Sequence, residues 1–124
     1  MRAMKTEGEK PSAGPGFQEG LRLITCVVQR GKADKVAKAA VEAGAAGATI
    51  FYARGMGLRE RLGLLGLAIV PEKEVLMIVC KEEEVRAIFA AVVNAANLNT
   101  PGMGIAYVIP IHEVAGLIPT RRTI

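Results

Sequence analysis

The chain has 124 residues, of which 51% are hydrophobic and 4% aromatic, and it carries a formal net charge of +4. This composition suits one globular domain with a core of aliphatic side chains. The charge is spread along the chain without a block of five like charges, which argues against nucleic-acid binding. The apolar stretches are too short for direct membrane insertion.

The N-terminal segment and the cysteines indicate a cytoplasmic protein. Residues 1–20 are rich in Gly, Pro, Ser, Lys and Glu and lack the apolar core of a signal peptide. We expect them to form a flexible tail, because they bury too little apolar surface to offset the entropy of ordering. Cys26 and Cys80 lie in apolar runs without CxxC spacing, so we expect two buried, reduced thiols.

The first half of the domain has the pattern of a strand, a helix and a second strand. Residues 21–29 are rich in β-branched and other apolar side chains, and residues 48–53 resemble them. Between them, residues 32–43 have helical periodicity, with Asp34 in the first turn and Gly44 after the last. The apolar face of this helix, which we expect to be buried, consists of Ala33, Val36, Ala37, Ala40 and Val41.

The second half repeats this order. Residues 74–80 read as a strand, the glutamates at 82–84 suit a helix start, and residues 105–111 read as a last strand after a loop over 97–104. The expected buried face of the second helix consists of Val85, Ile88, Phe89, Val92, Val93 and Ala96.

This element order predicts an α+β fold. A β-α-β, connector, β-α-β chain over residues 21–118 is typical of a ferredoxin-like βαββαβ sandwich, in which two helices cover one face of a four-stranded antiparallel sheet. Residues 119–124 would form a C-terminal tail. A sheet with one solvated face should alternate apolar and polar residues, yet residues 75–80 and 105–111 carry no charge. We therefore expect other copies of the chain to cover the second face in a homo-oligomer.

The connector between the two halves, residues 54–73, is much longer than the usual two to six residues. Its Gly55-Met56-Gly57 could bind an anion together with Arg54 and Arg59, or could simply end a strand. Arg59 and Arg61 could instead pair with Glu60 on a solvated surface. The glycines of residues 100–104 allow the same two interpretations, a ligand contact or a helix-to-strand turn.

The middle of the connector is apolar. Leu58, Leu62 and Leu65 fall at helical spacing. They could pack onto their own oligomer, or they could present apolar anchors to a partner protein.

Four features in order resemble the PII signal-transduction family (nitrogen regulatory protein P-II): the β-α-β repeat, the turn Gly44-x-x-Gly47-x-Thr49, Gly55-Met56-Gly57, and Gly102-Met103-Gly104. The resemblance covers roughly residues 21 to 118. It implies a homotrimer that senses adenine nucleotides (ATP, ADP or AMP) in clefts between subunits and requires no further cofactor. It also implies docking on a membrane transporter or metabolic enzyme through a loop, here residues 58–73. The implied ligand-binding residues are Thr49, Gly55, Gly57, Arg59, Val79, Gly102 and Gly104, and the implied docking residues are Leu62, Leu64, Leu65 and Leu67.

The chain departs from the family pattern at the cations that reach phosphate. Ile105 stands where the family has a lysine, and Gly116 and Ile118 stand where it has two arginines. Arg121 and Arg122 could substitute if the tail folds back. These departures favour an alternative, a trimeric interaction or scaffold protein of the same fold that binds no nucleotide. They make the chain a divergent, PII-like member.

Catalytic and metal-binding motifs are missing from the sequence. Walker A, Gly-x-Ser-x-Gly and cysteine–histidine protease signatures do not occur, so we expect no enzyme. His112 is the only histidine and has no carboxylate cluster beside it, which indicates a structural residue and disfavours a metal-tolerance trimer of similar architecture. Tyr52 and Tyr107 lie in expected strands, so the connector offers no tyrosine for modification.

Overall fold

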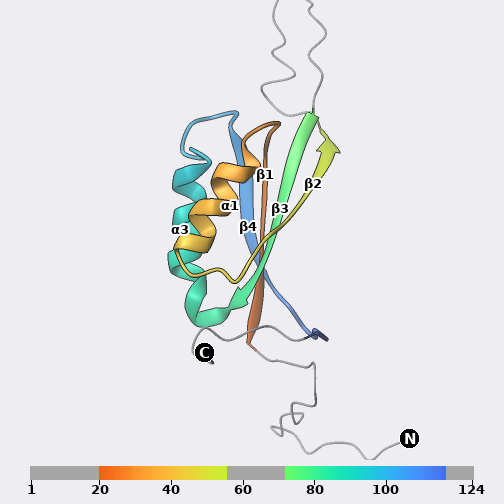
Figure 1. Ribbon diagram of the computed structural model, residues 1–124, viewed down its shortest axis with the longest axis vertical. Helices are drawn as coiled ribbons and strands as arrows, with labels where there is room; N and C mark the ends of the chain where they lie inside the picture. The colour runs from red at the N-terminus through yellow and green to blue at the C-terminus, as the bar shows by residue number, and fades with distance from the viewer. Residues whose placement is uncertain (1–19, 56–71, 117–124) are drawn as a thin grey trace, which may run out of the picture.

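The computed structural model describes residues 20–55 and 72–116 (Figure 1). The predicted tails over residues 1–20 and 119–124, apart from Gly20, and nearly all of the predicted connector lie outside these ranges. The elements are β1 (Leu21–Gln29), α1 (Ala33–Glu42), β2 (Thr49–Arg54), β3 (Glu72–Lys81), the 3₁₀ helix η2 (Glu82–Glu84), α3 (Val85–Ala95) and β4 (Gly104–Pro110).

The strands form one sheet in the order β2-β3-β1-β4, and every neighbouring pair is antiparallel. Both helices lie against the same face of this sheet (Figure 1). The predicted ferredoxin-like sandwich is therefore confirmed. None of the helices in the described part of the chain is long and apolar enough to span a membrane.

The core lies between the helices and one face of the sheet. Cys26 of β1 is opposite Leu76 of β3 and Ala106 of β4, and directly opposed residues share a face. Eleven side chains from this face and from the inner sides of the helices are at most 3% exposed: Ile24, Cys26, Val28, Ala33, Val36, Ala40, Leu76, Ile78, Cys80, Ile88 and Val92. Burying each of the large aliphatic ones contributes roughly 1.5–3 kcal/mol. The prediction of two buried cysteines is confirmed.

The opposite side of the sheet, which we call the open face, is also apolar. It carries the odd-numbered residues of all four strands, among them Phe51, Ile105, Tyr107 and Ile109. These four side chains are 44%, 59%, 45% and 45% exposed in the single chain. The bare apolar face predicted from the strand sequences is present, and its burial in an oligomer stays a prediction.

Helix α1 begins and ends as its sequence predicts, but one of its apolar residues is not buried. The backbone N–H of Ala33 donates to Oε1 of Glu74 at 2.8 Å, which satisfies a donor that the helix leaves unpaired. The helix ends at Glu42 with Ala43 as its C-cap, and Gly44 follows with φ +123°. Val41 is 49% exposed, so its predicted burial is wrong. One residue beyond Ala40 turns the side chain about 100° around the helix, away from the sheet.

The remaining differences concern element boundaries. Strand β3 begins at Glu72, inside the predicted connector 58–73, because Glu72 and Lys73 pair with Arg54 and Ala53 of β2. The three glutamates before α3 form a separate 3₁₀ turn, η2. The carboxylate of Glu84 accepts the backbone N–H of Lys81 at 2.9 Å and stabilises the start of this turn.

Candidate functional site

Two of the predicted ligand turns meet at one end of the sheet, where β2 ends and β3 begins. Gly55 follows β2, and Gly102 lies in the loop before β4. Gln29, the last residue of β1, connects them: its Nε2 donates to the carbonyl of Gly102 at 3.4 Å, and its Oε1 accepts from Nζ of Lys73 at 3.4 Å. The Lys73 side chain runs beside Gly55, since a Cβ built on Gly55 would lie 3.7 Å from Lys73 Cγ.

Lys73 is a cation that sequence reasoning did not assign to the site. Its side chain is 8% exposed and is held between the two glycine turns by the contacts above. The sequence analysis left it in the connector, because a strand start has no periodicity of its own. One signal could have found it: Lys73 is six residues before Val79, and an even separation along a strand places both on the same face.

Gly104 has a packing role in the sheet. Its φ is +146°, and a Cβ at this position would lie 2.2 Å from the carbonyl oxygen of Val27. Real Cβ atoms do not approach an oxygen so closely, so only glycine allows β4 to pair with β1 here. Gly102, with φ +85°, likewise has a backbone conformation that favours glycine. The backbone conformation therefore explains why glycine occupies both positions, whether or not a ligand binds there.

The other described candidates, Thr49 and Val79, lie on the open face away from the glycine turns. Thr49 is opposite Met77, so Val79 is its diagonal neighbour. Val79 pairs with Leu23, whereas Gly104 pairs with Val28, five residues further along β1. That separation is about 17 Å at 3.4 Å per residue. Within a single chain, the predicted ligand-binding residues therefore form two separate groups, one at the glycine turns and one at Thr49 and Val79.

The remaining predicted residues cannot be located in the structure. The ligand candidates Gly57 and Arg59 and the docking leucines Leu62, Leu64, Leu65 and Leu67 lie outside the described residues. Ile105, at the position of the family's lysine, is an exposed residue of the open face.

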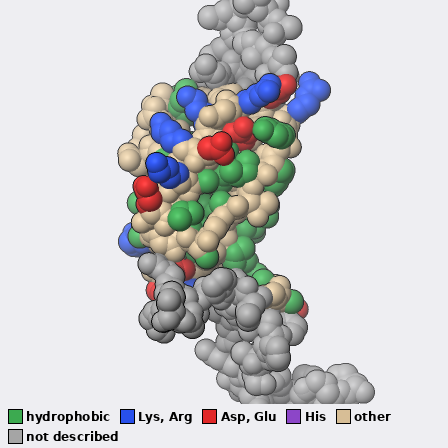
Figure 2. Space-filling model, in the orientation of Figure 1, with side chains coloured by type: hydrophobic (Ala, Val, Ile, Leu, Met, Phe, Trp, Pro, Cys, Tyr) green, Lys and Arg blue, Asp and Glu red, His purple; other side chains and the backbone are tan. Residues whose placement is uncertain are grey.

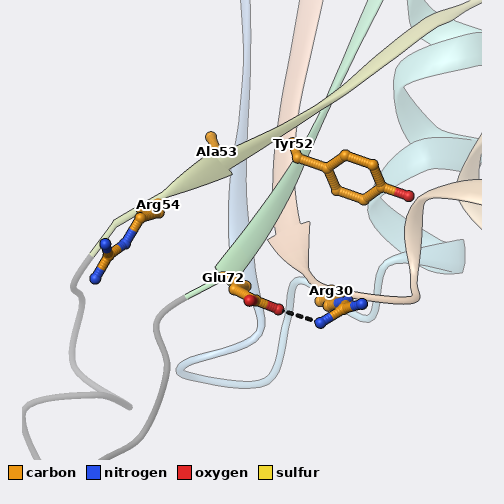
Figure 3. A pocket seen from close by; sticks show the side chains of 5 residues that line it. All are labelled: Arg30, Tyr52, Ala53, Arg54 and Glu72. Carbon is orange, nitrogen blue, oxygen red and sulfur yellow. Dashed lines mark hydrogen bonds and ion pairs between the residues drawn. The ribbon is translucent and has the colours of Figure 1, made fainter.

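A groove opens on the helix side of β2 at the same end of the sheet (Figure 3). Its volume is about 510 Å³, and it is lined by Arg30, Tyr52, Ala53, Arg54 and Glu72. We call it the outer groove. The carboxylate of Glu72 forms an ion pair with Arg30, which lies in the turn between β1 and α1. Tyr52 is 76% exposed. Lys and Arg side chains lie at this end of the molecule, interspersed with Asp and Glu side chains (Figure 2).

Both cysteine thiols have raised pKa values, and His112 belongs to no metal-binding group in the described part of the chain. Burial raises the pKa of the Cys26 thiol to about 11. Burial, followed by the nearby Glu84 carboxylate, also raises the pKa of Cys80, against a smaller lowering by Arg22. Reactive cysteines need the opposite shift. No group of three or more His, Cys, Asp or Glu residues that could hold a metal ion occurs among residues 20–55 and 72–116.

Comparisons with known proteins agree with this fold. A solved structure of PII from Arabidopsis thaliana bound to citrate matches with a TM-score of 0.58 and 20% identity, over 75% of this chain and 78% of that chain. At this identity the likeness supports the fold alone. Comparison with curated proteins gives no match. The family described as nitrogen regulatory protein P-II matches residues 21–120, which is most of the chain. The chain therefore belongs to the PII family of regulatory proteins.

Proposed function

We propose that this protein is a cytoplasmic, PII-like regulator that binds a small anionic effector, an adenine nucleotide, at the glycine turns. Occupancy of this site would be signalled to a partner protein, a membrane transporter or metabolic enzyme, through residues 58–73. The observation that carries the proposal is the contact of Gln29 with both Lys73 and the carbonyl of Gly102. It brings a cation and two glycine turns to one end of the sheet.

Lys73 supplies the positive charge that the sequence pattern lacks at Ile105. Phosphate groups are held by cations and by backbone N–H groups of glycine-rich turns. Ile105 provides no charge, but the ammonium of Lys73 carries one between Gly55 and Gly102. A mostly buried cation interacts with an anion more strongly than an exposed one, because water screens it less.

A homotrimer would complete the site. Thr49 and Val79 lie on the open face, far from the glycine turns of their own chain, so they could contact the same ligand only from a neighbouring subunit. The exposed Ile105, Tyr107 and Ile109 of that face make such packing favourable, since a large exposed apolar patch is rare on a monomer. We propose a regulatory role without an enzymatic reaction.

Calorimetric titration of the full chain with ATP, ADP and AMP tests this function, with the oligomeric mass measured by light scattering. We expect a trimer and saturable heat with at least one nucleotide. Because the related PII structure contains citrate, the titration should also include a carboxylate as a possible effector. An intact trimer that gives no heat with any nucleotide at millimolar concentration would refute nucleotide sensing.

One observation favours a second candidate, a constitutive interaction protein of the same fold. The family's phosphate-binding cations are replaced by Ile105 and Gly116, and the apolar open face needs no nucleotide to pack. An intact trimer that stays silent in the titration above, yet binds its partner equally with and without nucleotide, would support this candidate instead.

A further inference from the structure

A second groove lies at the opposite end of the sheet from the glycine turns, where β1 begins and η2 leads into α3 (Figure 1). Its volume is about 430 Å³, and it is lined by Arg22, Glu82, Val85, Arg86, Phe89 and Ala90. We call it the α3 groove. We propose that it binds a small molecule that combines a single carboxylate with an apolar body, such as an aryl or branched alkyl monocarboxylate.

Three residues of α3 give this groove an apolar wall. Val85 and Phe89 are four positions apart, so they lie on the same face of the helix, and both pack against the core while remaining partly exposed. Ala90 is exposed beside them, and its short side chain leaves space that a longer one would fill. The volume lies in the range of roughly 300–1,000 Å³ that is usual for small-molecule sites, so the wall can receive the apolar body of a ligand.

Arg86 provides a cation at the rim of the groove. It precedes Ala90 by four positions, so the two residues are neighbours on the surface of α3. Among the residues that the structure describes, no hydrogen bond or ion pair of the Arg86 side chain is found. A guanidinium presents several donors in a planar fork that matches a carboxylate. Arg86 can therefore hold the carboxylate of a ligand whose apolar body contacts Phe89.

The ion pair of Arg22 with Glu82 sets the charge that a ligand must carry. One guanidinium nitrogen of Arg22 donates to the carbonyl of Leu21 at 3.0 Å, and another lies 3.2 Å from the Glu82 carboxylate. The two arginines and the glutamate of the lining leave one net positive charge, which a monocarboxylate neutralises. A phosphate or a dicarboxylate would bring further negative charge close to Glu82, and like charges repel.

The α3 groove is separate from both the open face and the glycine turns. Arg22 is paired with Cys80 in the sheet, and Cys80 belongs to the core beneath the helices, so the groove lies on the helix side of the sheet. Packing of the open face in an oligomer therefore does not cover it. Arg22 and Gln29 stand at opposite ends of β1, about 24 Å apart at 3.4 Å per residue.

Nuclear magnetic resonance of the full chain at constant ionic strength tests the proposal with three probes. These are phenylacetate, its uncharged analogue phenylacetamide, and acetate, which lacks the apolar body. We expect phenylacetate to cause saturable shifts of the Arg86 Nε–H signal and of the Phe89 ring. The other two probes should bind at least about fivefold more weakly, because each lacks one of the two contacts. The Tyr107 ring and the Gly102 amide are internal controls and should stay unchanged.

Two pairs of variants complete the test. Ala90→Leu should abolish phenylacetate binding because the larger side chain fills the groove, whereas Ala87→Leu, at an exposed alanine of α3 outside the lining, should leave binding unchanged. Both alanines are exposed and leucine is a good helix former, so we expect both variants to fold. Arg86→Gln should weaken binding about fivefold, while Lys38→Gln on the exposed side of α1 should have no effect.

Three results would overturn the proposal: no saturable shift with phenylacetate, equally strong binding of phenylacetamide or acetate, or equal effects of Ala90→Leu and Ala87→Leu. Shifts confined to Tyr107 or Gly102 would assign the probe to the open face or the glycine turns, and would also reject the α3 groove as its site. None of these outcomes depends on whether the protein binds a nucleotide.

Discussion

Replacing Gln29 by glutamate would place a carboxylate where the amide now contacts both Lys73 and Gly102. The present distances are 3.4 Å from Oε1 to Lys73 Nζ and 3.4 Å from Nε2 to the Gly102 carbonyl oxygen. The new carboxylate would neutralise Lys73 and could no longer donate to Gly102. We expect Gln29→Glu to leave stability nearly unchanged and to weaken nucleotide binding strongly.

The two effects can be estimated separately. For stability, an added ion pair with Lys73 contributes up to about 1 kcal/mol, and the lost hydrogen bond to Gly102 costs about 1 kcal/mol, so the two nearly cancel. For binding, one unit of charge is removed about 4 Å from the ligand's anion, which is worth about 1 to 4 kcal/mol between water and a partly buried site. That range corresponds to an affinity loss of about fivefold to several hundredfold.

Urea denaturation and calorimetric titration with ATP measure the two quantities on the same preparation. Gln29→Leu is the matched control, because it removes both hydrogen bonds of Gln29 but leaves the charge of Lys73 in place. We expect it to lower the free energy of unfolding by about 1–2 kcal/mol and to retain most of the affinity. If Gln29→Glu binds ATP within a factor of two of the natural chain, Lys73 does not hold the effector and the assignment of the site is wrong.

Three further predictions follow from packing and burial. Gly104→Ala should lower the free energy of unfolding by about 2–3 kcal/mol or more, because its Cβ would strike Val27, whereas Gly55→Ala should change it by under about 1 kcal/mol in the same denaturation assay. Stability should fall by about 2 kcal/mol as pH rises from 9 to 11, because the unfolded Cys26 thiol loses its proton while burial keeps the folded one protonated; an unchanged pH profile in Cys26→Ala would contradict this. Tyr107→Glu should reduce the mass measured by light scattering, because a charge on the open face opposes its burial.

The fold could be predicted from sequence because the apolar residues of each strand and helix recur with the period of that element. The alternation of Ile24, Cys26 and Val28 and the helical spacing of Ile88 and Val92 both encode burial against the same core, and all five are at most 2% exposed. The prediction failed for Val41, because a helix face is wider in sequence than the strip that actually contacts the sheet.

The candidate site was less predictable, because it depends on register. Gly55 and Gly102 were identified by their turn chemistry, which is a local signal. Lys73 was missed because its role comes from pairing with Gln29, 44 residues away in the chain. The Arg30–Glu72 ion pair is equally nonlocal, because its partners are 42 positions apart in the chain. Sequence periodicity does not report which residues of two strands stand opposite each other.

The start of β3 places the outer groove and the glycine turns next to adjacent residues. Consecutive residues of a strand point to opposite faces, so Glu72 faces the outer groove and Lys73 faces the glycine turns. Both residues pair with the last residues of β2, Arg54 and Ala53, and residues 56–71 join these two strand ends. An effector held by Lys73 would compete with Gln29 for the Lys73 ammonium. Effector binding would therefore act directly at the end of residues 58–73, the proposed docking segment.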